Sequence, residues 1–94
     1  MIQSFKCKET AKLFDIGFSR KFPPGIIKPA IIRLAMLNRS RNLNDLTVPT
    51  SNHLEKLSGD RKSQYSIRIN EKYRVCFKWH NNNAHEVEIV DYHD

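Results

Sequence analysis

Several features that would place a protein in a membrane or a repeat class are missing from this chain of 94 residues. The opening residues lack the apolar core of a signal peptide, and no run approaches the roughly 20 apolar residues of a membrane-spanning helix. Internal repeats and low-complexity segments are also absent from the sequence. We therefore expect a cytoplasmic protein with no membrane segment, folded as a single domain over residues 1–94.

Cysteine is scarce, and the histidines are scattered. Cys7 and Cys76 lie far apart, and Cys76 falls inside a strand pattern, so reduced thiols fit better than a disulfide. A structural zinc site would need paired ligand spacing. The histidines show no such pairing with the cysteines, at His53, His80, His85 and His93. The sequence thus predicts no metal site and no cofactor.

Basic residues are abundant. Lysine and arginine outnumber aspartate and glutamate by 16 to 10, which gives a net charge of +6. Hydrophobic residues make up 39% of the chain and charged residues 28%, as in an ordinary globular domain. So much positive charge on so short a chain favours a polyanionic partner, nucleic acid before an acidic protein. The alternative is a basic surface that serves only solubility.

The first half of the chain has helical periodicity. Apolar residues at helical spacing predict a helix over residues 6–16, with Gly17 placed to end it. A second amphipathic helix is predicted over residues 26–38. Pro29 leaves two possibilities open: this helix begins near Lys28 with Pro29 in its first turn, or it is kinked.

The second half has strand periodicity. Residues 39–51 lose their periodicity and predict a loop, with one helical turn at Leu43 and Leu46. A short strand is also predicted near the start of the chain, over residues 2–5. Alternating residues predict three further strands, over residues 64–69, 73–79 and 85–90, the last two joined by a turn at 80–83. Helices followed by antiparallel strands indicate an α+β domain, in which the helices pack on the sheet.

The turn between the first two of these three strands fixes the position of two arginines. The apolar faces of the strands match only if a three-residue loop, residues 70–72, pairs Ile69 with Tyr73. A two-residue loop would turn one apolar set toward water. The favoured register places Arg68 directly across from Arg74.

Like charges in such a cross-strand pair cost a few tenths to about 1 kcal/mol. A bound phosphate would turn this repulsion into a two-pronged clamp, and we favour that interpretation. The alternative is that both arginines lie over the sheet and pair with Glu86 and Glu88 of the next strand. In either case the polar face of the sheet is predicted to be open and basic.

Groups able to transfer protons lie near these arginines in the expected fold. The chain closes on Asp91-Tyr92-His93 after a strand, and Glu55 lies just before the strands. Cleavage of RNA without a metal requires a base for the 2′-hydroxyl, an acid for the leaving 5′-oxygen and cations for the phosphorane. Glu55 is a candidate base and the terminal group a candidate acid. Each also has an interpretation without catalysis. Glu55 could be a solvated acid, Tyr92 and His93 could be a frayed chain end, and Asp91 could cap backbone donors.

Several segments together resemble the HigB toxins of the RelE superfamily. They are LEKLSGDR at 54–61, YSIRIN at 65–70, YR at 73–74 and VEIVDYH at 87–93, and the resemblance extends to the opening residues. It implies a microbial-ribonuclease-like α+β fold and an mRNA interferase that cleaves translated messenger RNA in the ribosomal A site without a metal. It also implies a HigA-type helix-turn-helix antitoxin as partner, with operator DNA bound only through the toxin–antitoxin complex.

The resemblance also assigns roles to residues. Arg68 and Arg74 would bind the scissile phosphate, and Asp91, Tyr92 and His93 would form the terminal catalytic group. Further contacts to RNA or the ribosome would come from Lys56, Arg61, Lys62 and Lys78. The position of Glu55 resembles a histidine in at least one HigB and a glutamate in the similar YoeB toxins, which leaves the identity of the base open.

Two other classes remain as alternatives. ParE-like proteins share this fold but poison DNA gyrase, and they are not expected to carry a terminal Asp-Tyr-His over two arginines. A noncatalytic RNA- or DNA-binding module would need the basic face but neither Glu55 nor His93. The sequence shows no helix-turn-helix and no aromatic stacking platform on that face.

Overall fold

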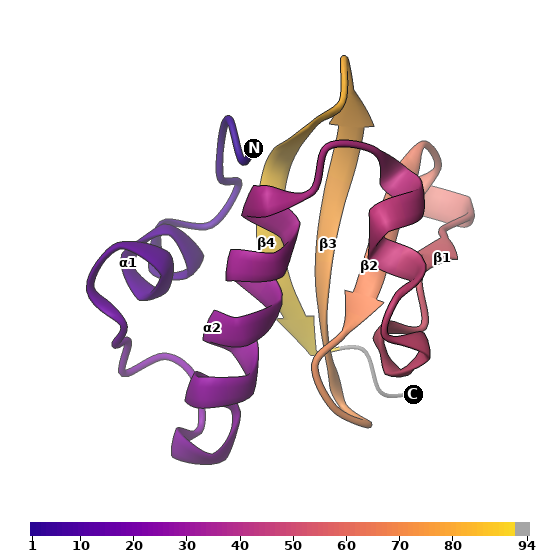
Figure 1. Cartoon of the computed structure of the whole chain (residues 1–94). Coiled ribbons are helices and arrows are strands. Elements are labelled where there is room, and N and C mark those ends of the chain that lie inside the picture. The colour runs from indigo at the N-terminus through magenta and orange to yellow at the C-terminus, as the bar shows by residue number, and fades with distance from the viewer. Residues whose placement is uncertain (92–94) are drawn as a thin grey trace.

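The structure, a computed structural model, describes residues 1–91 of the chain. Helices come first and strands follow (Figure 1). The elements are α1 (Lys8–Ile16), α2 (Pro24–Arg39), β1 (Glu55–Lys56), β2 (Gln64–Arg68), β3 (Tyr73–His80) and β4 (Asn83–Asp91). Short 3₁₀ turns lie between them, η1 (Leu43–Thr47), η2 (Thr50–Asn52) and η3 (Gly59–Arg61).

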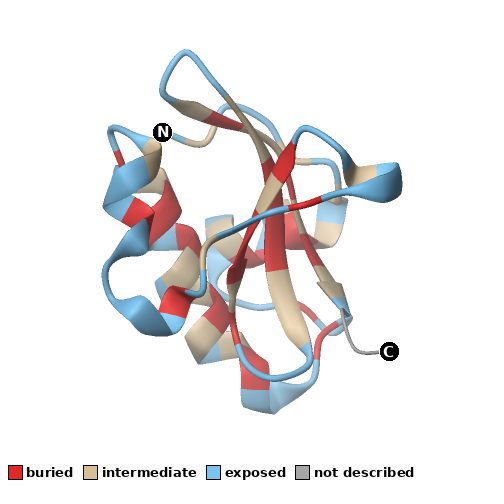
Figure 2. Cartoon of the chain, turned by 90° about the vertical axis from the view of Figure 1, so that its right-hand side faces the viewer, coloured by how far each residue is buried: buried red, intermediate tan, exposed pale blue. Residues whose placement is uncertain are grey.

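The four strands form one antiparallel sheet in the order β1-β2-β3-β4. Helix α2 crosses one face of this sheet, and α1 lies beside α2 on the β4 side (Figure 1). Buried residues are concentrated where the helices and the sheet face each other (Figure 2). Leu34 and Leu37 of α2 meet Val75 and Phe77 of β3 in this layer, and all four are fully buried. The α+β architecture predicted from the sequence is confirmed.

Helix α1 ends where the sequence predicts. It runs from Lys8 rather than from residue 6, and Gly17 follows its last residue with a left-handed φ of 74°. The Gly17 amide donates to the carbonyl oxygen of Leu13 at 2.9 Å, which satisfies a backbone acceptor at the end of the helix. The same Leu13 and nearby Thr10 are buried, so this turn of the helix is anchored in the core.

Helix α2 excludes one of the two possibilities left by Pro29, a helix that begins near Lys28. It begins at Pro24, earlier than the predicted residue 26, and it continues through Pro29 to Arg39. Proline suits the first helical position because its fixed φ matches the helix and its missing N–H has no helical acceptor there. Pro29 therefore lies inside the helix, not in its first turn.

Within residues 1–91, no helix combines the length and the apolar character that crossing a bilayer requires.

The prediction of a strand over residues 2–5 is wrong, because this segment forms only isolated bridges. Ile2 and Phe5 form isolated parallel bridges with Ala84 and Val87 of β4. Between these bridges β4 bulges at Glu86, whose φ is 51°, and the Glu86 amide donates to the Ser4 hydroxyl at 2.9 Å. The bulge breaks the even spacing that a continuous ladder needs, so the N-terminal segment follows β4 without becoming a fifth strand.

The predicted register of the first hairpin is confirmed. Arg68 is the cross-strand partner of Arg74, and the Ile69 amide donates to the Tyr73 carbonyl oxygen at 2.9 Å. The Asn70 side chain closes the loop, because its Oδ1 accepts from the amides of Lys72 and Tyr73 at 2.9 and 2.8 Å.

The second hairpin is tighter than predicted. Asn81 and Asn82 have φ of 51° and 60° and form a two-residue turn, so β3 extends to His80 and β4 begins at Asn83. Asparagine tolerates this left-handed backbone better than most residues, and the conformation matches the twist of the flanking strands.

We expect Gly17→Ala to lower the free energy of unfolding by about 1 kcal/mol, because the left-handed backbone disfavours a Cβ. The added Cβ would meet only Ile31 Cδ1, at an ordinary 3.8 Å, so steric clash makes no contribution. Gly25→Ala is the matched control within α2, where nothing lies within 4 Å, and it should be neutral or stabilising by up to about 1 kcal/mol. Urea unfolding measures both, and equal effects at the two glycines would contradict this account of the helix end.

Candidate functional site

A two-residue strand at the edge of the sheet positions the predicted base. Strand β1 pairs with β2 so that Glu55 lies opposite Ser66 and Lys56 opposite Tyr65. Just before it, Asn52 is fully buried, and its amide donates to the Leu46 carbonyl oxygen at 3.1 Å. This anchor fixes the end of η2, and with it the loop that leads into β1.

Arg74 is the most firmly held charged residue of this region. Its side chain is only 13% exposed. Its Nε donates to the Ser66 hydroxyl at 2.8 Å, and its Nη2 donates to the His53 carbonyl oxygen at 2.6 Å. The same Nη2 lies 3.4 Å from Oε2 of Glu55, an ion pair. These contacts fix the plane of the guanidinium and join β3, β2 and the loop before β1 at one point.

Arg68 is held less firmly than Arg74. It is half-buried, and its Nε donates to the Asn70 carbonyl oxygen at 3.1 Å, within the adjacent loop. Its own backbone is secured from the other layer, because Arg33 of α2 donates from Nε to the Arg68 carbonyl oxygen at 2.9 Å. The two cross-strand arginines therefore differ: one is fixed by the fold, and the other has a more adaptable head group.

The acidic residues of β4 have basic partners from elsewhere. Glu86 pairs with Lys78 at 2.9 Å, and this hydrogen bond holds the pKa of the Glu86 carboxyl below its usual value. Glu88 pairs with Lys6 and Arg61, both at 3.5 Å. Arg74 instead pairs with Glu55 of β1. Among the described residues, it is thus Glu55 on β1 that offsets the charge repulsion between the two arginines.

The polar face of the sheet is less open than predicted. Ser66 and Cys76, which alternation places there, are fully buried. Arg74 donates to the Ser66 hydroxyl on this face, and Glu88, the cross-strand partner of Cys76, pairs with Arg61 and Lys6. Burial raises the pKa of the Cys76 thiol to about 11. The thiol therefore remains protonated near neutral pH and is not a nucleophile.

The predicted RNA-contact residues fall into two groups. Lys56, which follows Glu55 on β1, and Lys62, after η3, are exposed. Arg61 is largely covered and bonds both Glu88 and Gln64 Oε1, the latter at 3.3 Å. Lys78 is half-exposed and holds Glu86. The two exposed lysines are therefore better placed to meet a ligand than the two paired residues.

Asp91 lies at the same end of the sheet as the arginines. It closes β4 as the cross-strand partner of Tyr73, next to Arg74, and its Oδ2 lies 3.7 Å from Nζ of Lys72. The other two members of the predicted terminal group, Tyr92 and His93, lie outside the described residues. Within residues 1–91, no cluster of three or more His, Cys, Asp or Glu is arranged to hold a metal ion.

Sequence reasoning missed the groups that hold Arg74. Ser66 could have been found, since alternation places it on the same face, one step along the ladder from Arg74. The His53 contact could not, because it uses a backbone carbonyl whose direction depends on a left-handed φ of 44°. Sequence reasoning also missed Arg33 of α2, which donates to the backbone carbonyl oxygen of Arg68. A contact from a helix to a strand carbonyl leaves no pattern in the sequence.

Comparisons with known proteins identify the family. Residues 3–93 match the family described as "RelE-like toxin of type II toxin-antitoxin system HigB". Toxin HigB-1 of Vibrio cholerae is 32% identical over 80 residues, covering 84% of each chain. Endoribonuclease HigB of Proteus vulgaris is 29% identical over 93 residues, covering 99% of this chain and all of that one. The chain belongs to the HigB family of RelE-like toxins of type II toxin–antitoxin systems.

The fold is shared with more distant proteins. The YoeB–YefM complex of Staphylococcus aureus contains a chain that matches with a TM-score of 0.61, covering 100% of this chain and 99% of that one. Its sequence identity is 17%, so this likeness concerns the fold.

Contrary to what the cross-strand repulsion alone would suggest, we expect Arg74→Ala to lower the free energy of unfolding by about 1–3 kcal/mol. The buried Ser66 hydroxyl would lose its hydrogen-bond partner. Arg68→Ala, which removes only a local contact, should stay within about 0.5 kcal/mol of the parent.

A double-mutant cycle tests this explanation. Combining Arg74→Ala with Ser66→Ala should cost less than the sum of the single changes, because the second change removes the group left without a partner. Thermal and urea unfolding of the four proteins measure the cycle, and strict additivity would show that Ser66 does not hold Arg74.

Proposed function

We propose that this toxin is a ribosome-dependent endoribonuclease that cleaves messenger RNA in the ribosomal A site by acid–base catalysis without a metal. It would act in the cytoplasm and arrest translation and growth. The name of the Proteus vulgaris relative, Endoribonuclease HigB, supports the activity. The observation that carries the proposal is the fixed Arg74 guanidinium, with Arg68 across from it and Glu55 in contact with it.

The arginines would stabilise the charge that develops on the phosphate. Catalysis gains most from donors that are already oriented before the transition state forms. Arg74 meets this condition, because Ser66 and the His53 carbonyl hold its guanidinium in place. Arg68, with its more adaptable head group, would close on the phosphate from across the hairpin.

Glu55 would act as the general base. Its side chain is 55% exposed and lies against Arg74, so an RNA 2′-hydroxyl could reach the carboxylate while the adjacent phosphate contacts the arginine. Lys56 and Lys62, exposed nearby, would add contacts to the RNA backbone or to the ribosome.

The end of the chain would supply the acid. Asp91 ends β4 as the cross-strand partner of Tyr73, the residue before Arg74. In the proposal, His93 protonates the leaving 5′-oxygen, Tyr92 orients the ribose or the base, and Asp91 supports them. The ribosome would present the message in the required geometry, which makes translated RNA the substrate.

The partner would be a HigA-type antitoxin with a DNA-binding helix-turn-helix, and the toxin would meet operator DNA only through that complex. The S. aureus structure, a YoeB–YefM toxin–antitoxin complex, supports this kind of pairing on the same fold.

Expression of the toxin without its antitoxin should stop growth through loss of translated messages. Primer extension should then reveal new 5′ ends inside coding frames. Arg68→Ala is the matched inactive control, and its cleavage should fall by roughly 10²–10³-fold through loss of one charge-stabilising group. Intact messages accompanied by lost supercoiling and broken DNA would instead identify a gyrase poison, and binding without cleavage would identify a noncatalytic module.

We expect His93→Gln to slow single-turnover cleavage on intact ribosomes by roughly 10²-fold or more, because glutamine cannot donate a proton near neutral pH. His80→Gln is the control, an exposed histidine at the far end of β3. It should cleave at the parent rate, and both variants should keep the parent melting temperature. Chelation that spares ribosomal magnesium should leave the rate unchanged, and a fully active His93→Gln would place the acid elsewhere.

A further inference from the structure

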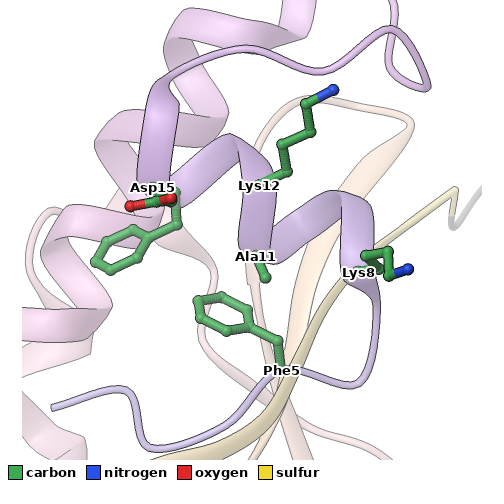
Figure 3. Close-up of a pocket in the computed structure, with 6 residues that line it drawn as sticks. Phe5, Lys8, Ala11, Lys12 and Asp15 are labelled. Atoms are coloured by element: carbon green, nitrogen blue, oxygen red, sulfur yellow. The ribbon is translucent and has the colours of Figure 1, made fainter.

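A groove runs between the N-terminal segment and helix α1, away from the residues discussed above. Its volume is about 710 Å³. Figure 3 shows Phe5 facing Ala11 across it, with the side chains of Lys8 and Lys12 extending outward from α1. The residues that line it are Phe5, Lys8, Ala11, Lys12, Phe14 and Asp15.

The floor of this groove is apolar. The rings of Phe5 and Phe14 lie 5.8 Å apart between centroids and are tilted by 43°, and both are half-buried. At the end of α1 and just after it in the chain, the apolar side chains of Ile16 and Phe18 remain 61% and 51% exposed. An exposed apolar surface can mark a site that another molecule covers.

Helix α1 presents apolar side chains both to the core and to the groove. Thr10 and Leu13 are fully buried, and Phe14, which packs against the core, also lines the groove together with Ala11. The lysines at the rim leave the apolar floor accessible between charged head groups.

The groove and Glu55 lie at opposite edges of the sheet. Helix α1 and the N-terminal segment contact β4, at one edge, whereas Glu55 belongs to β1, at the other edge (Figure 1). A protein could therefore bind the groove and the messenger RNA could contact Arg74 through separate sets of residues.

We infer that this groove binds an acidic segment of the cognate antitoxin, which inserts apolar side chains between Phe5 and Ala11; the inference rests on the toxin–antitoxin pairing proposed above. The charges favour this occupant, because Lys8 and Lys12 at the rim, on a chain of net charge +6, attract carboxylates. RNA fits poorly, since the tilted rings offer no flat stacking face. A second copy of the chain would bring lysine against lysine.

Binding of the purified full-length antitoxin to the toxin tests the inference without any measurement of RNA cleavage. Lys8→Glu/Lys12→Glu should slow association by roughly 10-fold or more at low salt. The matched control, Lys28→Glu/Arg41→Glu, makes the same change in net charge at exposed positions outside the groove and should bind markedly faster.

A second variant and a second method address the apolar floor. Ala11→Phe would fill the groove without emptying the core, and it should raise the Kd by roughly 30-fold, the effect of losing one central contact. Hydrogen exchange should slow in residues 5–18 when the antitoxin binds. Unchanged affinity in both groove variants would overturn the inference, as would unchanged exchange in this segment or toxin self-association that these substitutions abolish.

The outcomes separate this inference from the proposed activity. A toxin that cleaves no RNA but binds its antitoxin through the groove would refute only the ribonuclease. A groove variant that still arrests growth, and that the antitoxin no longer neutralises, supports both.

Discussion

The position of the Arg74 guanidinium depends on a junction that joins three parts of the chain. Ser66 on β2 and the His53 carbonyl before β1 each accept a hydrogen bond from it, and Glu55 balances its charge. A single cation thereby ties the short edge strand to the central strands. A buried or half-buried charge is tolerated only where such partners exist, so the geometry of this region and its positive charge are maintained by the same contacts.

The core sets the register on which this junction relies. Ile67 and Val75 are fully buried partners on the helix-facing side of β2 and β3. A slip of one residue would expose them and would also separate Ser66 from Arg74. Hydrophobic burial on one face of the sheet therefore controls the spacing of polar groups on the other.

Much of this arrangement could be predicted from the sequence, because it follows from periodicity. Alternation gave the pairing of Arg68 with Arg74, and Gly17 marked the end of α1. The openness of the polar face could not be predicted, because the burial of Cys76 depends on where long side chains from distant segments fold back. The bulge at Glu86 was equally hidden, since a non-glycine residue with positive φ leaves no compositional mark.

The contact between Arg74 and His53 has a consequence for how this family can diverge. Because the acceptor is a backbone oxygen, the hydrogen bond depends on the path of the chain at this position and not on the imidazole. Asparagine and glycine adopt the same left-handed conformation readily. Either residue could therefore replace His53 while the Arg74 guanidinium keeps its orientation. Ser66 has no such freedom, because its contribution is a side-chain oxygen.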